Sequence, residues 1–171
     1  MSPHPRAFVP ALFVVCLAAT CLAGQPAPTP ASAYKTELNI TFCKLERKEL
    51  KLNAFLPPNP GTAGPAGSGT GRAPAMVEIH GGWWCGGGPG RKVENIPGWQ
   101  TFTRKGIALF SISYRLGKEG GFPRNIRDCR NAIRFLRKNA QRFNIDPERI
   151  GCLGISAGGH LSLMAAMAPE D

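Results

Sequence analysis

The sequence predicts an α/β domain with a mostly parallel sheet and helices on both faces. Short apolar strands alternate with segments of helical periodicity between residues 75 and 167, and the joints between them are short. This order is typical of parallel strands connected by right-handed helical crossovers. Hydrophobic residues make up 43% of the 171 residues and charged residues 19%, a balance that suits a globular core and argues against general disorder.

The first 36 residues are expected to lie outside the folded domain. Residues 1–23 have the pattern of a secretory signal peptide, with a basic start and an apolar run too short for a membrane span. We therefore expect no stable membrane span and a secreted or periplasmic protein. Lipid anchoring through Cys21, or retention of the segment as an uncleaved anchor, is the less favoured alternative. Residues 24–36 are rich in Pro and Ala and predict a disordered tail.

The partial domain is predicted to span residues 37–171. The alternating, β-branched pattern at 37–56 predicts a two-stranded hairpin, and the Gly, Pro, Ala and Ser composition of 57–74 predicts a flexible insertion. Apolar runs predict buried strands, and a 3.6-residue period predicts helices. The strands are expected at 75–79, 107–113 and 149–155, and the helices at 94–105, 124–143 and 157–167. Pro97 and Gly98 are expected to break the first of these helices early.

The helix predicted at 124–143 carries seven cationic residues in a chain of formal net charge +10. A basic stripe of this kind is able to bind nucleic acid. Apolar residues recur at helical spacing between the charges, however, so we favour an amphipathic helix with a solvated basic face and expect no nucleic-acid partner. On this helix, Asp128 is expected to form an ion pair with Arg115, which follows the strand predicted at 107–113. This pair is expected to brace the junction between strand and helix, and not to bind substrate.

Four cysteines remain after the predicted signal peptide. In an exported protein they allow two disulfides with three connectivities. Cys129 and Cys152 fall in apolar patterns, so we favour small core residues for these two. No C-x-x-C pair occurs, and we expect neither a metal site nor an organic cofactor.

The motif Gly-Ile-Ser-Ala-Gly at 154–158 lies between the last predicted strand and the last predicted helix. A serine on such a sharp turn has a strained backbone, so its neighbours two positions away must be small, here Gly154 and Gly158. The turn exposes the hydroxyl at the positive end of the following helix. In a chain with 21 glycines the pattern alone is weak, but its position between strand and helix is the one that a nucleophile requires. We expect Ser156 to be the catalytic nucleophile; a glycine-rich joint without catalytic function is the alternative.

A second motif, His80-Gly81-Gly82, follows the strand predicted at 75–79. Backbone N–H groups in such a loop stabilise the negative charge that develops on a carbonyl oxygen during acyl transfer. We expect the oxyanion hole to use the N–H groups of Gly82, Trp83 and Ala157, with His80 and Gly81 as the supporting loop. No G-K-[ST] follows, which argues against a phosphate-binding loop.

Four segments, taken in this order, resemble the esterase/lipase branch of the α/β-hydrolases: V-E-I-H-G-G-W-W, I-S-Y-R-L, F-P-x-x-I-R-D-C and D-P-E-R-I-G-C-L-G-I-S-A-G-G-H-L. The nearest groups are carboxylesterases, hormone-sensitive-lipase relatives, and feruloyl and acetyl-xylan esterases. The resemblance covers about residues 37–168 and implies an α/β-hydrolase fold truncated after the helix that follows the nucleophile. It also implies a triad of serine, acid and histidine in that chain order. Trp83 stands where relatives often have a third glycine.

Two functions remain open. The first is a secreted serine ester hydrolase that transfers an acyl group to water through an acyl-enzyme, acting on a small-molecule or carbohydrate ester. Its acid and histidine are expected beyond Asp171, so these residues alone are expected to be inactive, because neither His80 nor His160 is expected to serve as the base. The second is a degenerate, non-catalytic glycan- or anion-binding protein. A reading frame that continues beyond Asp171 with an acid and a histidine would favour the first. The sequence indicates no oligomeric state.

Overall fold

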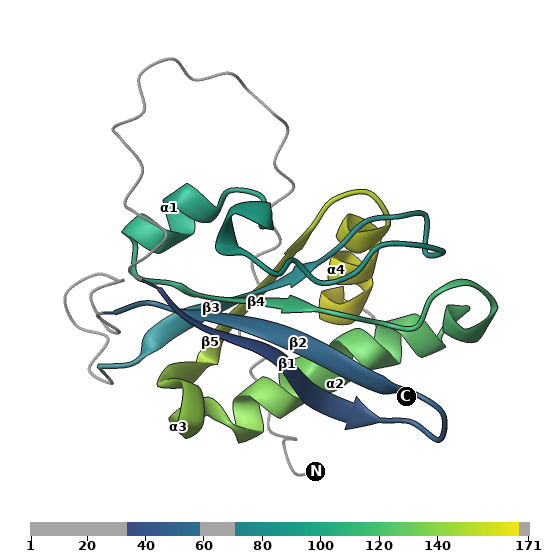
Figure 1. Cartoon of the computed structure of the whole chain (residues 1–171), viewed down its shortest axis with the longest axis horizontal. Helices are drawn as coiled ribbons and strands as arrows, with labels where there is room; N and C mark the ends of the chain where they lie inside the picture. Colours follow the sequence, from purple (N-terminus) through teal and green to yellow (C-terminus); the bar gives the residue numbers. More distant parts are fainter. Residues whose placement is uncertain (1–33, 59–70, 168–171) are drawn as a thin grey trace, which may run out of the picture.

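The computed structural model describes residues 34–58 and 71–167 (Figure 1). The predicted signal peptide, most of the predicted tail and most of the predicted insertion lie outside these residues. The strands of the single sheet are β1 (Lys35–Lys44), β2 (Glu49–Leu56), β3 (Ala73–Ile79), β4 (Ala108–Ile112) and β5 (Ile145–Gly154). The helices are η2 (Val93–Asn95), α1 (Trp99–Arg104), η3 (Gly117–Gly120), α2 (Arg124–Lys138), α3 (Ala140–Phe143) and α4 (Ala157–Met167).

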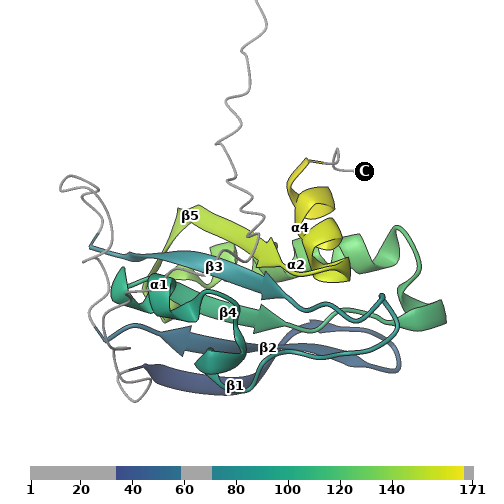
Figure 2. The ribbon, with the colours of Figure 1, turned by 90° about the horizontal axis from the view of Figure 1, so that it is seen from above.

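The sheet has the strand order β1-β2-β4-β3-β5, which Figure 2 shows from one edge to the other. β3 runs parallel to both β4 and β5, as predicted for the second half of the chain. β1 and β2 form the predicted antiparallel hairpin, and β2 joins β4 antiparallel. The sheet is therefore mixed, with a parallel part of three strands that leads to the turn at Ser156.

Helices cover both faces of the sheet, as predicted, with α1 on one side and α2 and α3 on the other (Figure 1). Alternate strand side chains point to opposite faces, and each face has its own apolar cluster. The first cluster joins the sheet to α2, α3 and α4 and includes Leu52, Val77, Phe110, Cys129, Leu136, Phe143 and Leu161. The second lies under η2 and α1 and includes Tyr34, Phe55, Ile96, Trp99, Phe102, Leu109 and Leu153.

The longest helix prediction needs correction. The helix predicted at 124–143 is divided into α2 and α3 at Asn139, whose side-chain Nδ2 and backbone N–H both donate to the carbonyl of Phe135, at 2.8 and 3.0 Å. An asparagine that satisfies the carbonyl of a helix end in this way favours termination. The break expected at Pro97 and Gly98 in the helix predicted at 94–105 is confirmed, because η2 and α1 lie on its two sides and Gly98 has φ +72°.

Two domain boundaries also shift. The tail predicted at 24–36 is wrong at its end, because Tyr34 is buried in the second cluster and β1 begins at Lys35. The insertion predicted at 57–74 is wrong at its end, because β3 begins at Ala73, whose N–H donates to the carbonyl of Asn144 at 3.0 Å. Pro74 is tolerated there because it is near the first residue of a strand.

The predicted ion pair between Arg115 and Asp128 is confirmed. The Asp128 side chain is fully buried and accepts three hydrogen bonds, from the Arg115 backbone N–H at 3.0 Å, Nε at 2.9 Å and Nη2 at 2.8 Å. Such charge-assisted, forked contacts are strong and geometrically specific. They fix the loop that follows β4 to the first turns of α2.

The thiols of Cys43, Cys85, Cys129 and Cys152 are all unpaired. Cys129 and Cys152 are buried, as expected for core residues, and burial raises the pKa of the Cys152 thiol to about 12. Within residues 34–58 and 71–167, no cluster of three or more His, Cys, Asp or Glu side chains is placed to hold a metal ion. The described helices include none with the length and apolar character needed to cross a membrane.

Replacing Asp128 is expected to destabilise the domain strongly. Asp128→Ala should lower the free energy of unfolding by about 3 kcal/mol, because it leaves the Arg115 guanidinium partly buried without its counter-charge. Glu37→Ala is the matched control, because the Glu37–Arg142 pair, at 3.1 Å, lies at the surface and should contribute under about 1 kcal/mol. Urea unfolding of both variants measures the two effects; equal losses would contradict the structural role of Asp128.

Candidate active site

Ser156 lies on the turn between β5 and α4, with φ +56°. This left-handed conformation is unfavourable for residues other than glycine. On its two sides, a Cβ atom built on Gly154 would lie 2.6 Å from the Ile79 carbonyl oxygen, and one on Gly158 would lie 2.7 Å from the His80 carbonyl oxygen. Both distances are shorter than real Cβ atoms allow, so neither position has room for a side chain.

The side chain of Ser156 is exposed, and no group among the described residues forms a hydrogen bond with its hydroxyl. Its own carbonyl accepts the N–H of His160 at 3.1 Å, so the residue stands at the first turn of α4. The partial positive charge of that helix end favours a negative charge at this point. The hydroxyl is therefore open to a ligand and lies where an oxygen that loses its proton is stabilised.

The loop that follows β3 lies against this turn. β3 and β5 are parallel neighbours with Ile79 opposite Gly154, so the segments that leave both strands emerge side by side. A Cβ atom built on Gly81 would lie 2.9 Å from the Ile155 carbonyl oxygen and 3.6 Å from the Ser156 Cβ. The absence of a side chain at Gly81 thus permits direct contact between the loop and the Ser156 turn.

Three backbone donors on these two segments have no partner among residues 34–58 and 71–167. The loop turns back at Gly82, whose carbonyl accepts the N–H groups of Cys85 and Gly86 at 3.0 Å each. The N–H groups of Gly82, Trp83 and Ala157 form no hydrogen bond within the described part of the chain. Free N–H groups on adjoining segments are able to bind an anionic oxygen between them.

His80 supports the loop from beneath. Its ring is buried and stacks on Tyr114, with the ring centroids 4.4 Å apart, and the Tyr114 hydroxyl donates to the His80 carbonyl at 2.9 Å. The ring Nδ1 lies 2.7 Å from the Gly81 carbonyl oxygen, which only accepts, so Nδ1 carries the proton. Burial lowers the pKa of His80, which keeps the ring neutral. His80 therefore holds the loop in place through both its ring and its backbone.

Aromatic side chains surround the other side of the Ser156 turn. The exposed ring of His160 meets Trp84 edge to face, with centroids 5.5 Å apart. These two residues, with Phe122 and Asn125, line a cavity of about 230 Å³. Trp83, by contrast, is 80% exposed and packs in neither apolar cluster.

A larger cavity of about 520 Å³ lies on the Ile155 side of the turn. Its walls include His80, Gly81 and a buried carboxylate, Glu78. Glu78 is not among the site residues expected from the sequence. The sequence does contain a signal for it, because Glu78 is the one charged residue in the otherwise apolar strand β3.

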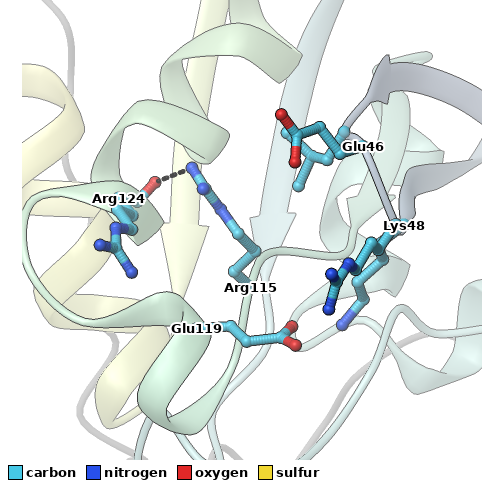
Figure 3. Close-up of a pocket in the computed structure, with 7 residues that line it drawn as sticks. Glu46, Lys48, Arg115, Glu119 and Arg124 are labelled. Atoms are coloured by element: carbon cyan, nitrogen blue, oxygen red, sulfur yellow. Dashed lines mark hydrogen bonds between the residues drawn. The ribbon is translucent and has the colours of Figure 1, made fainter.

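A third cavity, of about 390 Å³, lies between the β1–β2 turn and the start of α2 (Figure 3). It holds Arg47, Lys48, Arg115 and Arg124 beside Glu46 and Glu119. The Arg115 guanidinium points to the Arg124 carbonyl, 3.3 Å away, and is already engaged by Asp128. None of the Ser156 turn or of the His80–Trp83 loop lines this cavity, so its charges do not belong to the candidate site.

Comparison with known proteins gives relatives that are named as esterases or as a deacetylase. An acetylxylan esterase of Xylanibacter ruminicola is 31% identical over 144 residues, which cover 82% of this chain and 26% of that protein. An arylacetamide deacetylase of Oryctolagus cuniculus is 37% identical over 93 residues, 53% of this chain and 23% of that protein. The chain spans about a quarter of the length of these curated relatives.

Solved structures agree in fold. A truncated form of a carbohydrate esterase from gut microbiota superposes with a TM-score of 0.60 at 28% identity, over 81% of this chain and 45% of that chain. An esterase from Thermogutta terrifontis superposes with a TM-score of 0.58 at 27% identity, over 84% and 49%. The open five-stranded sheet therefore corresponds to part of an α/β-hydrolase fold. The family model BD-FAE matches residues 65–171, more than half of the sequence, and the chain thus belongs to the BD-FAE family, among the α/β-hydrolase esterases.

Proposed function

We propose that the protein containing these residues hydrolyses carboxylic esters, with Ser156 as the nucleophile. The observation that carries the proposal is the exposed Ser156 hydroxyl beside the N–H groups of Gly82, Trp83 and Ala157, none of which forms a hydrogen bond with another described residue. The esterase relatives support the same reaction. The apolar segment 1–23 supports the further proposal that the enzyme acts outside the cytoplasm.

In this reaction the Ser156 Oγ attacks the acyl carbon and the carbonyl oxygen becomes an oxyanion. The three N–H groups then stabilise that charge, and collapse of the tetrahedral intermediate releases the alcohol and leaves an acyl-enzyme. Water attacks the acyl-enzyme in the same way and releases the acid. The expected substrate is a small-molecule or carbohydrate ester.

The serine needs a general base. Of the two described histidines, His80 is buried with Nδ1 engaged by Gly81, and the ring of His160 packs against Trp84. Neither ring forms a hydrogen bond with the Ser156 hydroxyl. We therefore propose that the base is a histidine, oriented by an acid, from the part of the fold that follows α4 in the relatives.

Ser156→Ala is expected to abolish ester hydrolysis. In the protein expressed from its complete coding sequence, kcat/KM for 4-nitrophenyl acetate should fall by more than about a thousandfold, because the acyl-enzyme cannot form. In the unaltered protein, a fluorophosphonate probe should label Ser156, and mass spectrometry of the labelled peptide would show this. Ser113→Ala, at a hydroxyl that donates to the Lys51 carbonyl, is the matched control and should keep most activity. More than a tenth of the activity remaining in Ser156→Ala would refute the assignment.

Gly82→Ala tests the oxyanion hole. Gly82 has φ +119°, and a Cβ atom there would overlap the Gly86 carbonyl, so the substitution should displace the loop and its N–H groups. We expect kcat to fall by about a hundredfold or more with little change in KM, since the lost contacts form mainly in the transition state. Gly71→Ala is the control, because Gly71 also has a positive φ (+61°) but a Cβ atom there meets nothing within 4 Å. Equal kinetics in the two variants would exclude the loop from catalysis.

A further inference from the structure

A buried row of polar residues crosses the sheet beside the candidate active site. In the strand register Asn53 lies opposite Ser111, and Ser111 lies opposite Glu78. The three side chains are 2%, 0% and 7% exposed. On the same face, residues nearer the start of β3 and β4 pack in the apolar cluster under α1. The polar row thus replaces the apolar core only near the Ser156 turn.

Hydrogen bonds connect this row to the loop above it. The Ser111 Oγ donates to Glu78 Oε2 and accepts the Gly90 N–H at 2.7 Å. The Asn53 Nδ2 donates to the Gly90 carbonyl at 2.9 Å. Both the N–H and the carbonyl of Gly90 are therefore bonded to side chains of the sheet. These bonds hold the segment that ends at Gly90 without a ligand.

The cavity of about 520 Å³ lies between this loop and the Ser156 turn. Its lining includes Glu78, His80, Gly81, Gly90, Arg91 and Ile155. Ile155 directly precedes Ser156, and Gly81 contacts both residues. Glu78 Oε2 accepts from Ser111, whereas Oε1 forms no hydrogen bond within the described residues and keeps some contact with solvent. The residue as a whole is 7% exposed. A pre-formed cavity beside the nucleophile thus contains a carboxylate with one oxygen unpaired.

We propose that this cavity receives a hydroxyl-bearing alcohol portion of the ester, and that Glu78 selects it by accepting a hydrogen bond from that hydroxyl. An ionised carboxylate only accepts, so the complementary group must donate. An apolar group in the cavity would leave a buried carboxylate oxygen unpaired, which is costly and gives strong discrimination. The smaller cavity with Trp84 and Phe122 suits the apolar acyl group. This inference rests on the proposed function.

The protonation state of Glu78 provides a second way to test the proposal. Burial raises the pKa of Glu78 to about 6, and the Ser111 hydrogen bond opposes that rise. The carboxylate, the stronger acceptor, is therefore present above pH 6 and is lost as the pH falls through that value. Of the groups around it, Arg91 also lines the cavity, burial raises the pKa of Tyr114 to about 12, and burial lowers the pKa of His80.

The test compares 2-hydroxyethyl acetate with propyl acetate, which share the acetyl group and differ by a hydroxyl in place of a methyl. The ratio of their kcat/KM values, from acetate release followed by proton NMR at pH 8, should favour the hydroxylated ester. In Glu78→Gln this ratio should fall about five- to tenfold, because a neutral amide replaces the charged acceptor. The amide is isosteric and still accepts the Ser111 hydroxyl. Glu94→Gln, on the exposed turn η2 and outside the cavity lining, should keep the unaltered ratio.

The unaltered protein gives an independent measurement if Glu78→Gln does not fold. Its ratio should fall as the pH is lowered from 8 to 5, with a midpoint near 6. Where Glu78→Gln folds, its ratio should not change with pH. Both esters use the same nucleophile and base, so the titration of those groups cancels in the ratio. A ratio that is independent of pH, or equal in Glu78→Gln and Glu94→Gln, would overturn the inference. If Ser156→Ala still abolishes hydrolysis in that case, the proposed function stands; if it does not, the proposed function fails separately.

Discussion

The site depends on one close approach of backbone to backbone, between the end of β3 and the start of α4. Gly158 faces the carbonyls of Ile79 and His80 with no room for a Cβ atom, and Gly154 faces Ile79 in the same way. Because no side chain separates the segments, the turn at Ser156 and the loop after β3 lie in direct contact. A displacement of about 1 Å at such a junction is enough to lose much of the positioning on which catalysis depends.

The second face of the sheet serves two purposes along its length. At the start of β3 and β4 it carries the apolar cluster that packs under α1, and near their ends it carries Asn53, Ser111 and Glu78. Fully bonded buried polar groups rigidify their surroundings, whereas unpaired ones are costly. Here the Asn53 and Ser111 side chains hold the loop at Gly90, and Glu78, whose Oε1 forms no hydrogen bond within the described residues, lines the cavity. The same row therefore fixes the loop and gives the cavity its chemical character.

The sequence predicted the elements whose signals are local. The strand-to-helix turn at Ser156 follows from its glycines, and α4 has the predicted bounds, because a regular run of Ala, Leu and Met has no competing signal. The break at Asn139 was missed because the apolar periodicity continues through α3, while one asparagine side chain ends α2. The role of Glu78 needed the strand register, since Ser111 and Asn53 are far from it in the sequence and adjacent only in the sheet.

Positive φ values separate two kinds of position in this domain. Among the described residues other than glycine, they occur at Asn39 and Asn144, a residue type that tolerates them, and at Trp83, Trp84 and Ser156, which do not. Strain of this kind costs about 1–3 kcal/mol per residue, against a total stability of about 5–15 kcal/mol for an ordinary domain. Selection for stability alone would therefore relax these three positions first, for example to glycine. If related sequences keep the strained residues, this would indicate selection for activity.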